Sequence, residues 1–372
     1  MQNKGIILDN CKQIKEIFEQ NGVQRPFVCC GKSFQKTKAF EYLKQFDITV
    51  FDNIRPNPRF EDMVEASKLF NENKCDFIIG AGGGSPIDSA KMIRLMTTND
   101  IDTCLTEPMK NNGIKSLYIP TTAGTGAEAT KSSVFYINEK DKMSIANLDF
   151  LPDYVILDSS LLNTLPLYQR KVTSLDALCH SIESYWSVKA TDESREYAKK
   201  GILGFFENKN GYIKNTPDGN EGMLWASYYG GKEINITGTT AAHAMCYNIT
   251  MNCSVSHGHS VACDLSVIWE YMMKHLDKTN GGLTGEEIMK RFDEIGVLCG
   301  GKNAEDGLEI FNRVLSDFDL AFPKTDEKNI PLFVSKVDVT RLGNNPVKLD
   351  SDDLTAIYTE IFRRSVSYTH LT

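Results

Sequence analysis

Excess positive charge and long apolar runs are both missing from this chain. Its 372 residues hold 41 Lys and Arg against 49 Asp and Glu, which gives a formal net charge of −8 at pH 7. Because nucleic-acid-binding surfaces are basic, we expect no nucleic-acid partner. No segment has the ~18–20 consecutive apolar residues that a membrane span needs, and the first residues lack the apolar core of a signal peptide. We therefore expect a cytoplasmic protein with no membrane partner.

The chain also lacks closely spaced cysteine motifs and has few histidines. The ten cysteines form no Cys-x-x-Cys motif, so a structural zinc ribbon is not expected. Their even number allows disulfides, but thiols or metal ligands are favoured. There are only six histidines, and four of them fall between residues 176 and 259: His180, His243, His257 and His259. This clustering directs the search for a functional site to the second half of the chain.

The first half of the chain alternates between strand and helix patterns. Short β-rich runs recur at 27–30, 47–51, 76–80, 116–120 and 154–158. Amphipathic helical patterns lie at 8–20 and 60–73. This alternation predicts a parallel sheet covered on both faces, which binds ligands at the carboxyl ends of its strands. From residue 166 onward helical patterning dominates, and we place a domain boundary at Leu165–Pro166.

A glycine-rich loop follows the predicted strand at 76–80. Three successive glycines at 82–84 let backbone N–H groups approach a phosphate without side chains in the way. Ser85 is predicted to cap the helix that follows, with Pro86 at its first position, and the helix N-terminus favours an anion. An ordinary strand-to-helix turn is the alternative, but three glycines in a row favour a phosphate site.

A second loop of small residues follows the predicted strand at 116–120. Residues 120–128 read PTTAGTGAE, and such hydroxyl and glycine residues suit a backbone that wraps a polar ligand. Two loops of this type at neighbouring strand ends favour one long ligand, such as a dinucleotide, over two unrelated turns.

A candidate metal set lies in the second half. The helical pattern at 173–200, as one helix or two, places Asp176 and His180 on one face because they are four residues apart. With His243 and His257 they supply one carboxylate and three imidazoles. Taken singly, each segment also fits a helix-surface contact or a buried core histidine, but the combination favours a metal. Such donors suit Fe²⁺, Zn²⁺, Mn²⁺ or Ni²⁺ without choosing among them.

Together these motifs resemble the iron-containing (group III) alcohol dehydrogenases. The matching segments, in order, are Gly82-Gly-Gly-Ser-Pro-Ile-Asp88-Ser-Ala-Lys91, Pro120-Thr-Thr-Ala-Gly-Thr-Gly-Ala-Glu128, Leu151-Pro-Asp, Asp176-x-x-x-His180, His243 and His257-Gly. The resemblance implies an α/β, Rossmann-like NAD(P)-binding domain at 1–165. It also implies an all-α metal-binding and substrate domain at 166–372. Together they form a dehydroquinate synthase-like architecture, with the site in the cleft between the two domains.

The resemblance assigns a role to individual residues by position. The ligands of Fe²⁺, or of Zn²⁺, would be Asp176, His180, His243 and His257. The pyrophosphate of NADH or NADPH would contact Gly82, Gly83, Gly84, Ser85 and Asp88, and the rest of the dinucleotide would contact Thr121, Thr122, Thr125 and Lys142. The metal would act as a Lewis acid on the substrate oxygen, while hydride passes between nicotinamide and carbon.

The chain departs from the family pattern at Lys171, where a small apolar residue is usual, and at two further places. Tyr247 stands where many members have a histidine with a proton-transfer role, so proton transfer is predicted through Tyr247, His259 or a water chain. Gly31 and Lys32 follow the run at 27–30, where many NAD-preferring members have an aspartate. Because Gly31 removes the repulsion of a 2′-phosphate and Lys32 attracts it, we predict that NADPH is accepted.

Two further stretches indicate a substrate. Residues 176–195 and 242–259 resemble the phosphonoacetaldehyde reductase branch, which forms 2-hydroxyethylphosphonate. A phosphonate needs cations nearby, and the candidates are Lys131, Arg170, Lys171 and Lys189. The alternative for each is an ordinary solvated side chain on the surface. The alternatives are a short-chain primary alcohol or diol dehydrogenase, a dehydroquinate synthase-like lyase, and a non-catalytic nucleotide-binding protein. Asp176 is evidence against the lyase, which would use a Glu ligand at that position. The complete ligand set is evidence against the non-catalytic nucleotide-binding protein. The resemblance also implies a homodimer or larger homo-oligomer.

Overall fold

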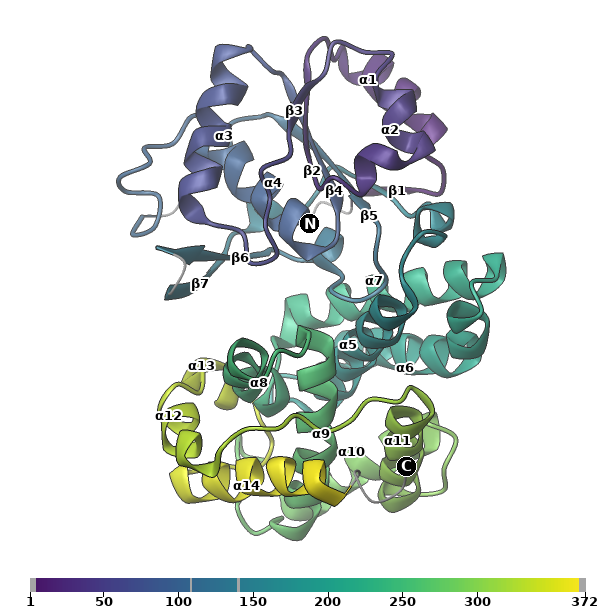
Figure 1. Ribbon diagram of the computed structural model, residues 1–372, viewed down its shortest axis with the longest axis vertical. Coiled ribbons are helices and arrows are strands. Elements are labelled where there is room, and N and C mark those ends of the chain that lie inside the picture. Colours follow the sequence, from purple (N-terminus) through teal and green to yellow (C-terminus); the bar gives the residue numbers. More distant parts are fainter. Residues whose placement is uncertain (1–4, 108, 139–140, 368–372) are drawn as a thin grey trace. The chain divides into compact units, whose positions relative to one another are not determined.

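The computed structural model describes residues 5–107, 109–138 and 141–367, and it divides the chain into two compact units (Figure 1). Unit 1 consists of Met1–Leu165 with Lys214–Gly231, and unit 2 of Pro166–Ile213 with Lys232–Thr372. The first division falls at the predicted boundary, but the return of the chain to unit 1 differs from the predicted continuous domain at 166–372. A close backbone approach accounts for the return, because a Cβ on Gly126 would lie 2.5 Å from the Gly231 nitrogen.

Unit 1 is built on a parallel six-stranded sheet with the order β1-β8-β5-β4-β2-β3. Its strands are β1 (Ile6–Leu8), β2 (Pro26–Cys30), β3 (Thr49–Phe51), β4 (Phe77–Gly82), β5 (Lys115–Pro120) and β8 (Tyr154–Ile156). Each of the five predicted β-rich runs contains a strand. The three-residue edge strand β1 was not predicted, and it is too short for a period-2 pattern to reveal.

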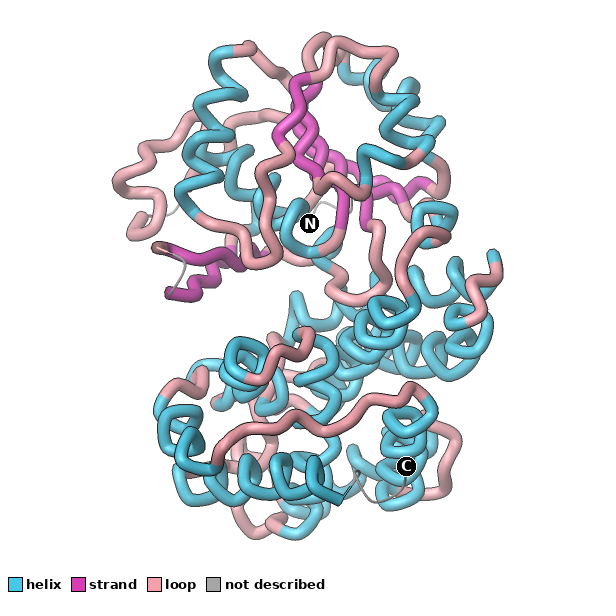
Figure 2. The backbone as a smooth tube through the Cα atoms, viewed as in Figure 1, coloured by secondary structure: helices cyan, strands magenta, loops and turns pink. Residues whose placement is uncertain are grey.

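Helices cover both faces of this sheet, as Figure 2 shows. They are α1 (Ile14–Asn21), α2 (Lys38–Leu43), α3 (Phe60–Glu72) and α4 (Gly84–Met96). Alternate residues of β2 face opposite sides. Phe27 packs in the same core cluster as residues of α3 and α4, and Val28 packs with residues of α1 and α2. The predicted α/β architecture is therefore confirmed for this part of the chain.

A salt-bridged lysine joins α4 to a separate hairpin formed by β6 (Ser132–Ile137) and β7 (Asp141–Ala146). The fully buried Lys91 Nζ donates to Asp88 Oδ1 at 3.0 Å and to the Ser132 carbonyl at 2.6 Å. The other carboxylate oxygen, Asp88 Oδ2, accepts from the Val134 nitrogen at 3.0 Å. Lys91 and Asp88 thus form an ion pair within α4, and each also binds the hairpin backbone, Lys91 at Ser132 and Asp88 at Val134.

Unit 2 is helical among its described residues. It contains α5 (Leu167–Trp186), α6 (Asp192–Ile213), α8 (Ala241–Asn252), α9 (His257–Lys274), α10 (Gly285–Leu298), α11 (Ala304–Asp317), α12 (Ile330–Ser335), α13 (Val339–Leu342) and α14 (Ser351–Ser367), while α7 (Pro217–Thr237) runs through both units. The pattern predicted at 173–200 as one helix or two is two, α5 and α6. Among the described helices, none is long and apolar enough to cross a membrane.

Replacing Lys91 by methionine tests the ion pair. The change leaves the Asp88 carboxylate, which is only 15% exposed, without its counter-charge, so we expect a loss of about 3 kcal/mol in the free energy of unfolding, measured by urea denaturation. The control is Lys44→Met, whose partner Glu41 is 64% exposed, and which should cost less than about 1 kcal/mol. Equal stability of the two variants would contradict the assignment.

Candidate functional site

Three of the predicted metal ligands lie together in unit 2. Asp176, His243 and His257 each offer one ligand atom, and these atoms lie within 4.8 Å of one another. Asp176 Oδ1 is 3.4 Å from His243 Nε2 and 3.6 Å from His257 Nε2. Asp176 and His243 are buried, whereas the His257 side chain is 42% exposed. The cluster therefore has one accessible side.

Helix packing brings these residues together. Asp176 lies on α5, His243 lies in the first turn of α8, and His257 begins α9. A Cβ on Gly258 would lie 2.0 Å from the Val172 carbonyl oxygen of α5. Only glycine therefore allows the first turn of α9 to approach α5 closely enough for His257 to reach Asp176.

The fourth predicted ligand, His180, lies beside this cluster. Its ring stacks on that of His243, with centroids 4.5 Å apart and planes at 13°. It is buried and one helical turn from Asp176 on α5. The structure thus groups three predicted ligands tightly and places His180 against one of them.

The charges of the cluster affect one another strongly. Burial would raise the pKa of Asp176, but the charges of His180, His257 and His243 outweigh it and hold that pKa below its usual value. Burial would lower the pKa of His243, but Glu183 and Asp176 raise it to about 9. Without a metal, His243 therefore holds a proton that a metal ion would replace.

The donor set fits a divalent cation. Asp176 Oδ1 and His243 Nε2 are buried atoms with no hydrogen-bond partner, and leaving such atoms unsatisfied is unfavourable. A carboxylate with imidazoles is a common site for Fe²⁺ or Zn²⁺. A cation between these atoms would satisfy both.

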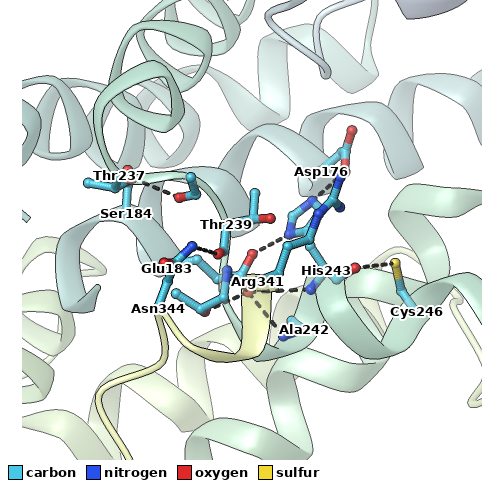
Figure 3. A network of polar contacts seen from close by, with 12 residues as sticks. Asp176, Glu183, Ser184, Thr237, Thr239, Ala242, His243, Cys246, Arg341 and Asn344 are labelled. Atoms are coloured by element: carbon cyan, nitrogen blue, oxygen red, sulfur yellow. Dashed lines mark hydrogen bonds and ion pairs between the residues drawn. The ribbon is translucent and has the colours of Figure 1, made fainter. Parts of the chain in front are cut away.

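Glu183 is a residue of this site that sequence reasoning missed. It accepts a hydrogen bond from His243 Nδ1, and its Oε1 accepts from the Thr240 nitrogen at 3.1 Å and the Ala242 nitrogen at 3.0 Å. Figure 3 shows Asp176, His243 and Glu183 within one network. The available signal was spacing, since Glu183 follows Asp176 by seven residues, or two helical turns.

The two predicted nucleotide loops lie side by side in unit 1. The Thr121 nitrogen donates to the Gly82 carbonyl at 2.8 Å. A Cβ on Gly83 would lie 3.4 Å from Thr122 Oγ1, and one on Gly84 would lie 3.2 Å from Thr125 Cγ2. Because β4 and β5 are neighbours in the sheet, their carboxyl ends present one continuous surface of small residues.

The start of α4 differs from the prediction. Ser85 does not cap the helix and Pro86 is not its first residue, because Gly83 is the N-cap and the helix begins at Gly84. No side chain caps it. Gly82 has φ +150°, and a Cβ there would lie 2.6 Å from Pro86 Cγ, so the chain turns into the helix earlier than expected. The first backbone N–H groups of α4 are thereby left for a bound anion.

The other predicted cofactor residues differ in their surroundings. Asp88 has its two oxygens turned to Lys91 and to the hairpin, so the geometry favours a scaffold role over the predicted pyrophosphate contact. Lys142 is partly buried on β7, opposite Tyr136. Gly31 and the exposed Lys32 follow β2, which pairs with β4.

The two predicted proton-transfer residues are held differently. His259 Nε2 donates to the Ala321 carbonyl at 2.8 Å, so Nδ1 accepts from the Tyr168 hydroxyl at 3.2 Å. Burial lowers the pKa of His259. Because both of its ring nitrogens are engaged, the geometry of His259 favours a structural role over the predicted relay. Tyr247 is half-buried on α8, four residues after His243.

Two of the predicted phosphonate-binding cations are engaged within unit 2. Arg170 Nη1 donates to the Tyr212 carbonyl at 2.9 Å, and its guanidinium lies 4.9 Å from the centroid of the same tyrosine ring. Lys171 pairs with Asp319 at 3.2 Å. Lys189 is exposed, as predicted for a solvated surface residue.

Comparison with known proteins identifies the family. Residues 6–159 match the family described as iron-containing alcohol dehydrogenase, and residues 171–362 match the C-terminal part of the Fe-containing alcohol dehydrogenase family. The chain therefore belongs to the iron-containing alcohol dehydrogenase family. It is an oxidoreductase of the alcohol dehydrogenase class, as the resemblance implied.

Individual relatives differ in the substrates that their names give. The chain is 26% identical over 345 residues to NADPH-dependent butanol dehydrogenase of Clostridium saccharobutylicum, covering 86% of each chain. It is 25% identical over 328 residues to phosphonoacetaldehyde reductase of Streptomyces viridochromogenes, covering 84% of this chain and 82% of the relative. The crystal structure of an iron-containing alcohol dehydrogenase from Thermotoga maritima shares the fold, with a TM-score of 0.83, 23% identity, and 98% and 99% of the two chains covered.

Two histidines on the same helix separate metal binding from helix packing. His257→Ala should lose bound Fe²⁺ or Zn²⁺ because it removes one of three clustered donors. The matched control His259→Ala should keep the metal and lower the thermal midpoint, since it removes the contacts to Tyr168 and Ala321. Metal analysis and thermal melting of both variants decide the matter, and full metal content in His257→Ala would contradict the site.

Proposed function

We propose that this protein is a metal-dependent, NAD(P)H-linked aldehyde reductase and that phosphonoacetaldehyde is its substrate. The observation that carries the general reaction is the cluster of Asp176, His243 and His257, whose ligand atoms lie within 4.8 Å in a buried setting with one exposed imidazole. Family membership supports the redox reaction on a C–O bond. The choice of aldehyde is the finer part of the proposal.

The residues of unit 2 hold the metal and orient its ligands. Asp176, His243 and His257 bind it, with His180 completing the set beside His243. When bound, a divalent metal supplies Lewis-acid polarisation of the substrate C–O bond. Burial of Asp176 and His243 excludes water from one side of the cluster, and the exposed His257 marks the side from which a substrate reaches it.

The residues of unit 1 bind the dinucleotide that carries the hydride. Gly82, Gly83 and Gly84 expose backbone N–H groups to its pyrophosphate, and the adjoining loop of Thr121, Thr122 and Thr125 lines the same surface. Gly31 and Lys32 at the end of β2 bring no negative charge toward a 2′-phosphate, which supports the use of NADPH. The NADPH-dependent relative is consistent with this choice.

The substrate proposal is supported by sequence similarity and weighed against a second candidate. The segments 176–195 and 242–259 and the phosphonoacetaldehyde reductase relative support a phosphonate substrate. The engagement of Arg170 and Lys171 with other partners favours instead a neutral short-chain aldehyde or diol as the second candidate. A cytoplasmic homodimer or larger assembly is also proposed from the family resemblance, and light scattering would detect it.

A panel of aldehydes tests the substrate. Phosphonoacetaldehyde, propanal, butanal and glycolaldehyde are assayed with NADPH and with NADH, following oxidation of the nicotinamide. We expect the highest kcat/KM for phosphonoacetaldehyde with NADPH. Equal rates for all four aldehydes would remove the phosphonate proposal, and a strong preference for NADH would remove the role of Gly31 and Lys32. Absence of turnover by metal-loaded protein would remove the reductase proposal itself.

Tyr247 is proposed to carry the proton to the product oxygen, since His259 has both ring nitrogens engaged. Tyr247→Phe removes the hydroxyl and keeps the ring, so we expect kcat to fall by about 10²-fold or more, with metal content unchanged. The pH profile of kcat is the second readout. An unaltered kcat and profile would assign proton transfer to water.

A further inference from the structure

We propose that Glu183 is a positioning residue that keeps a proton on His243 Nδ1 and thereby leaves Nε2 as the metal-binding nitrogen. The proposal rests on the metal site of the proposed function. It concerns the tautomer of one ligand, which the ligand set by itself does not determine. Its basis is the geometry of one buried carboxylate between the start of α8 and the His243 ring.

One oxygen of Glu183 is saturated by donors. Oε1 accepts from Thr240 Oγ1 at 2.7 Å and from the backbone nitrogens of Thr240, Ala242 and His243 at 3.1, 3.0 and 3.3 Å. These donors lie at the N-terminus of α8, where backbone N–H groups have no partner within the helix. They fix the carboxylate in place and stabilise its charge.

The other oxygen of Glu183 faces the histidine ring. Oε2 contacts His243 Nδ1, and Glu183 is fully buried, so no water competes for this contact. Because a carboxylate oxygen only accepts, Nδ1 must carry the hydrogen. The metal-binding lone pair then belongs to Nε2, which lies 3.4 Å from Asp176 Oδ1. Carboxylate partners of this kind orient metal-binding histidines and commonly change metal affinity by 10–100-fold.

The substitution Glu183→Gln separates control of the His243 tautomer from capping of α8. The donors around Oε1 require an oxygen there, so the Gln amide oxygen would take that place and keep α8 capped. The amide NH₂ would then face Nδ1 and donate to it. His243 would have to carry its hydrogen on Nε2, where it blocks the metal.

The test compares Glu183→Gln with Asp264→Asn. Asp264 is a fully buried carboxyl on α9 whose oxygens have no hydrogen-bond partner, and burial and the charge of Glu183 raise its pKa, so Asp264→Asn controls for the loss of a buried carboxyl near Glu183. Affinity for Zn²⁺ is measured by competition with a chelator, and folding by circular dichroism and thermal melting. We expect Glu183→Gln to remain folded and to bind Zn²⁺ 10–100-fold more weakly, and Asp264→Asn to bind like the wild type. Wild-type affinity in Glu183→Gln would overturn the proposal.

A second measurement uses the wild-type protein and therefore does not depend on whether the variant folds. The ¹⁵N shifts of the His243 ring in labelled wild-type protein, with and without Zn²⁺, report which nitrogen carries the hydrogen. Hydrogen on Nδ1 supports the proposal, and hydrogen on Nε2 overturns it. Wild-type protein that binds no Zn²⁺ would overturn the metal site of the proposed function, an outcome distinct from finding the hydrogen on Nε2 in the Zn²⁺-bound protein.

Discussion

The close approach of α9 to α5 is the constraint on which the metal cluster depends. Gly258 lies where any Cβ would come within 2.0 Å of the Val172 carbonyl, so a side chain at that position would push the two helices apart. Such a shift would carry His257 away from Asp176, whose Oδ1 is 3.6 Å from it. In the motif His257-Gly, the histidine is the proposed ligand, and the glycine lets the two helices approach closely enough for that ligand to reach Asp176.

Helix α5 supplies two buried carboxylates to the site, Asp176 and Glu183. Asp176 faces the clustered imidazoles, and Glu183, two turns later, faces the opposite nitrogen of His243. Both carboxylates are buried, and each has its pKa lowered by histidines that outweigh the effect of burial. Holding two buried charges is costly unless partners surround them. The start of α8 and the proposed cation provide those partners.

Much of this organisation could be predicted from the sequence, because it depends on local spacing. The Asp176/His180 pair, the glycine loop and the alternating strands all follow from short-range patterns. Spacing alone relates Glu183 to Asp176 on one helix, but its role could not be assigned, since its partner His243 lies 60 residues away. Nor could the role of Asp88 be predicted, because its second oxygen contacts Val134, 46 residues along the chain. Segment 214–231 belongs to unit 1, where Gly231 closely approaches the Gly126 backbone. Amino-acid composition cannot predict such a contact between distant residues.

The two clustered histidines differ in their surroundings. His243 Nδ1 is bonded to a buried carboxylate, whereas His257 Nδ1 lies 3.6 Å from the Cys246 thiol, a weak partner. His257 is also the exposed member of the cluster. Asp176 and His243 would hold a metal from the buried side, and the side at His257 is the one that solvent reaches.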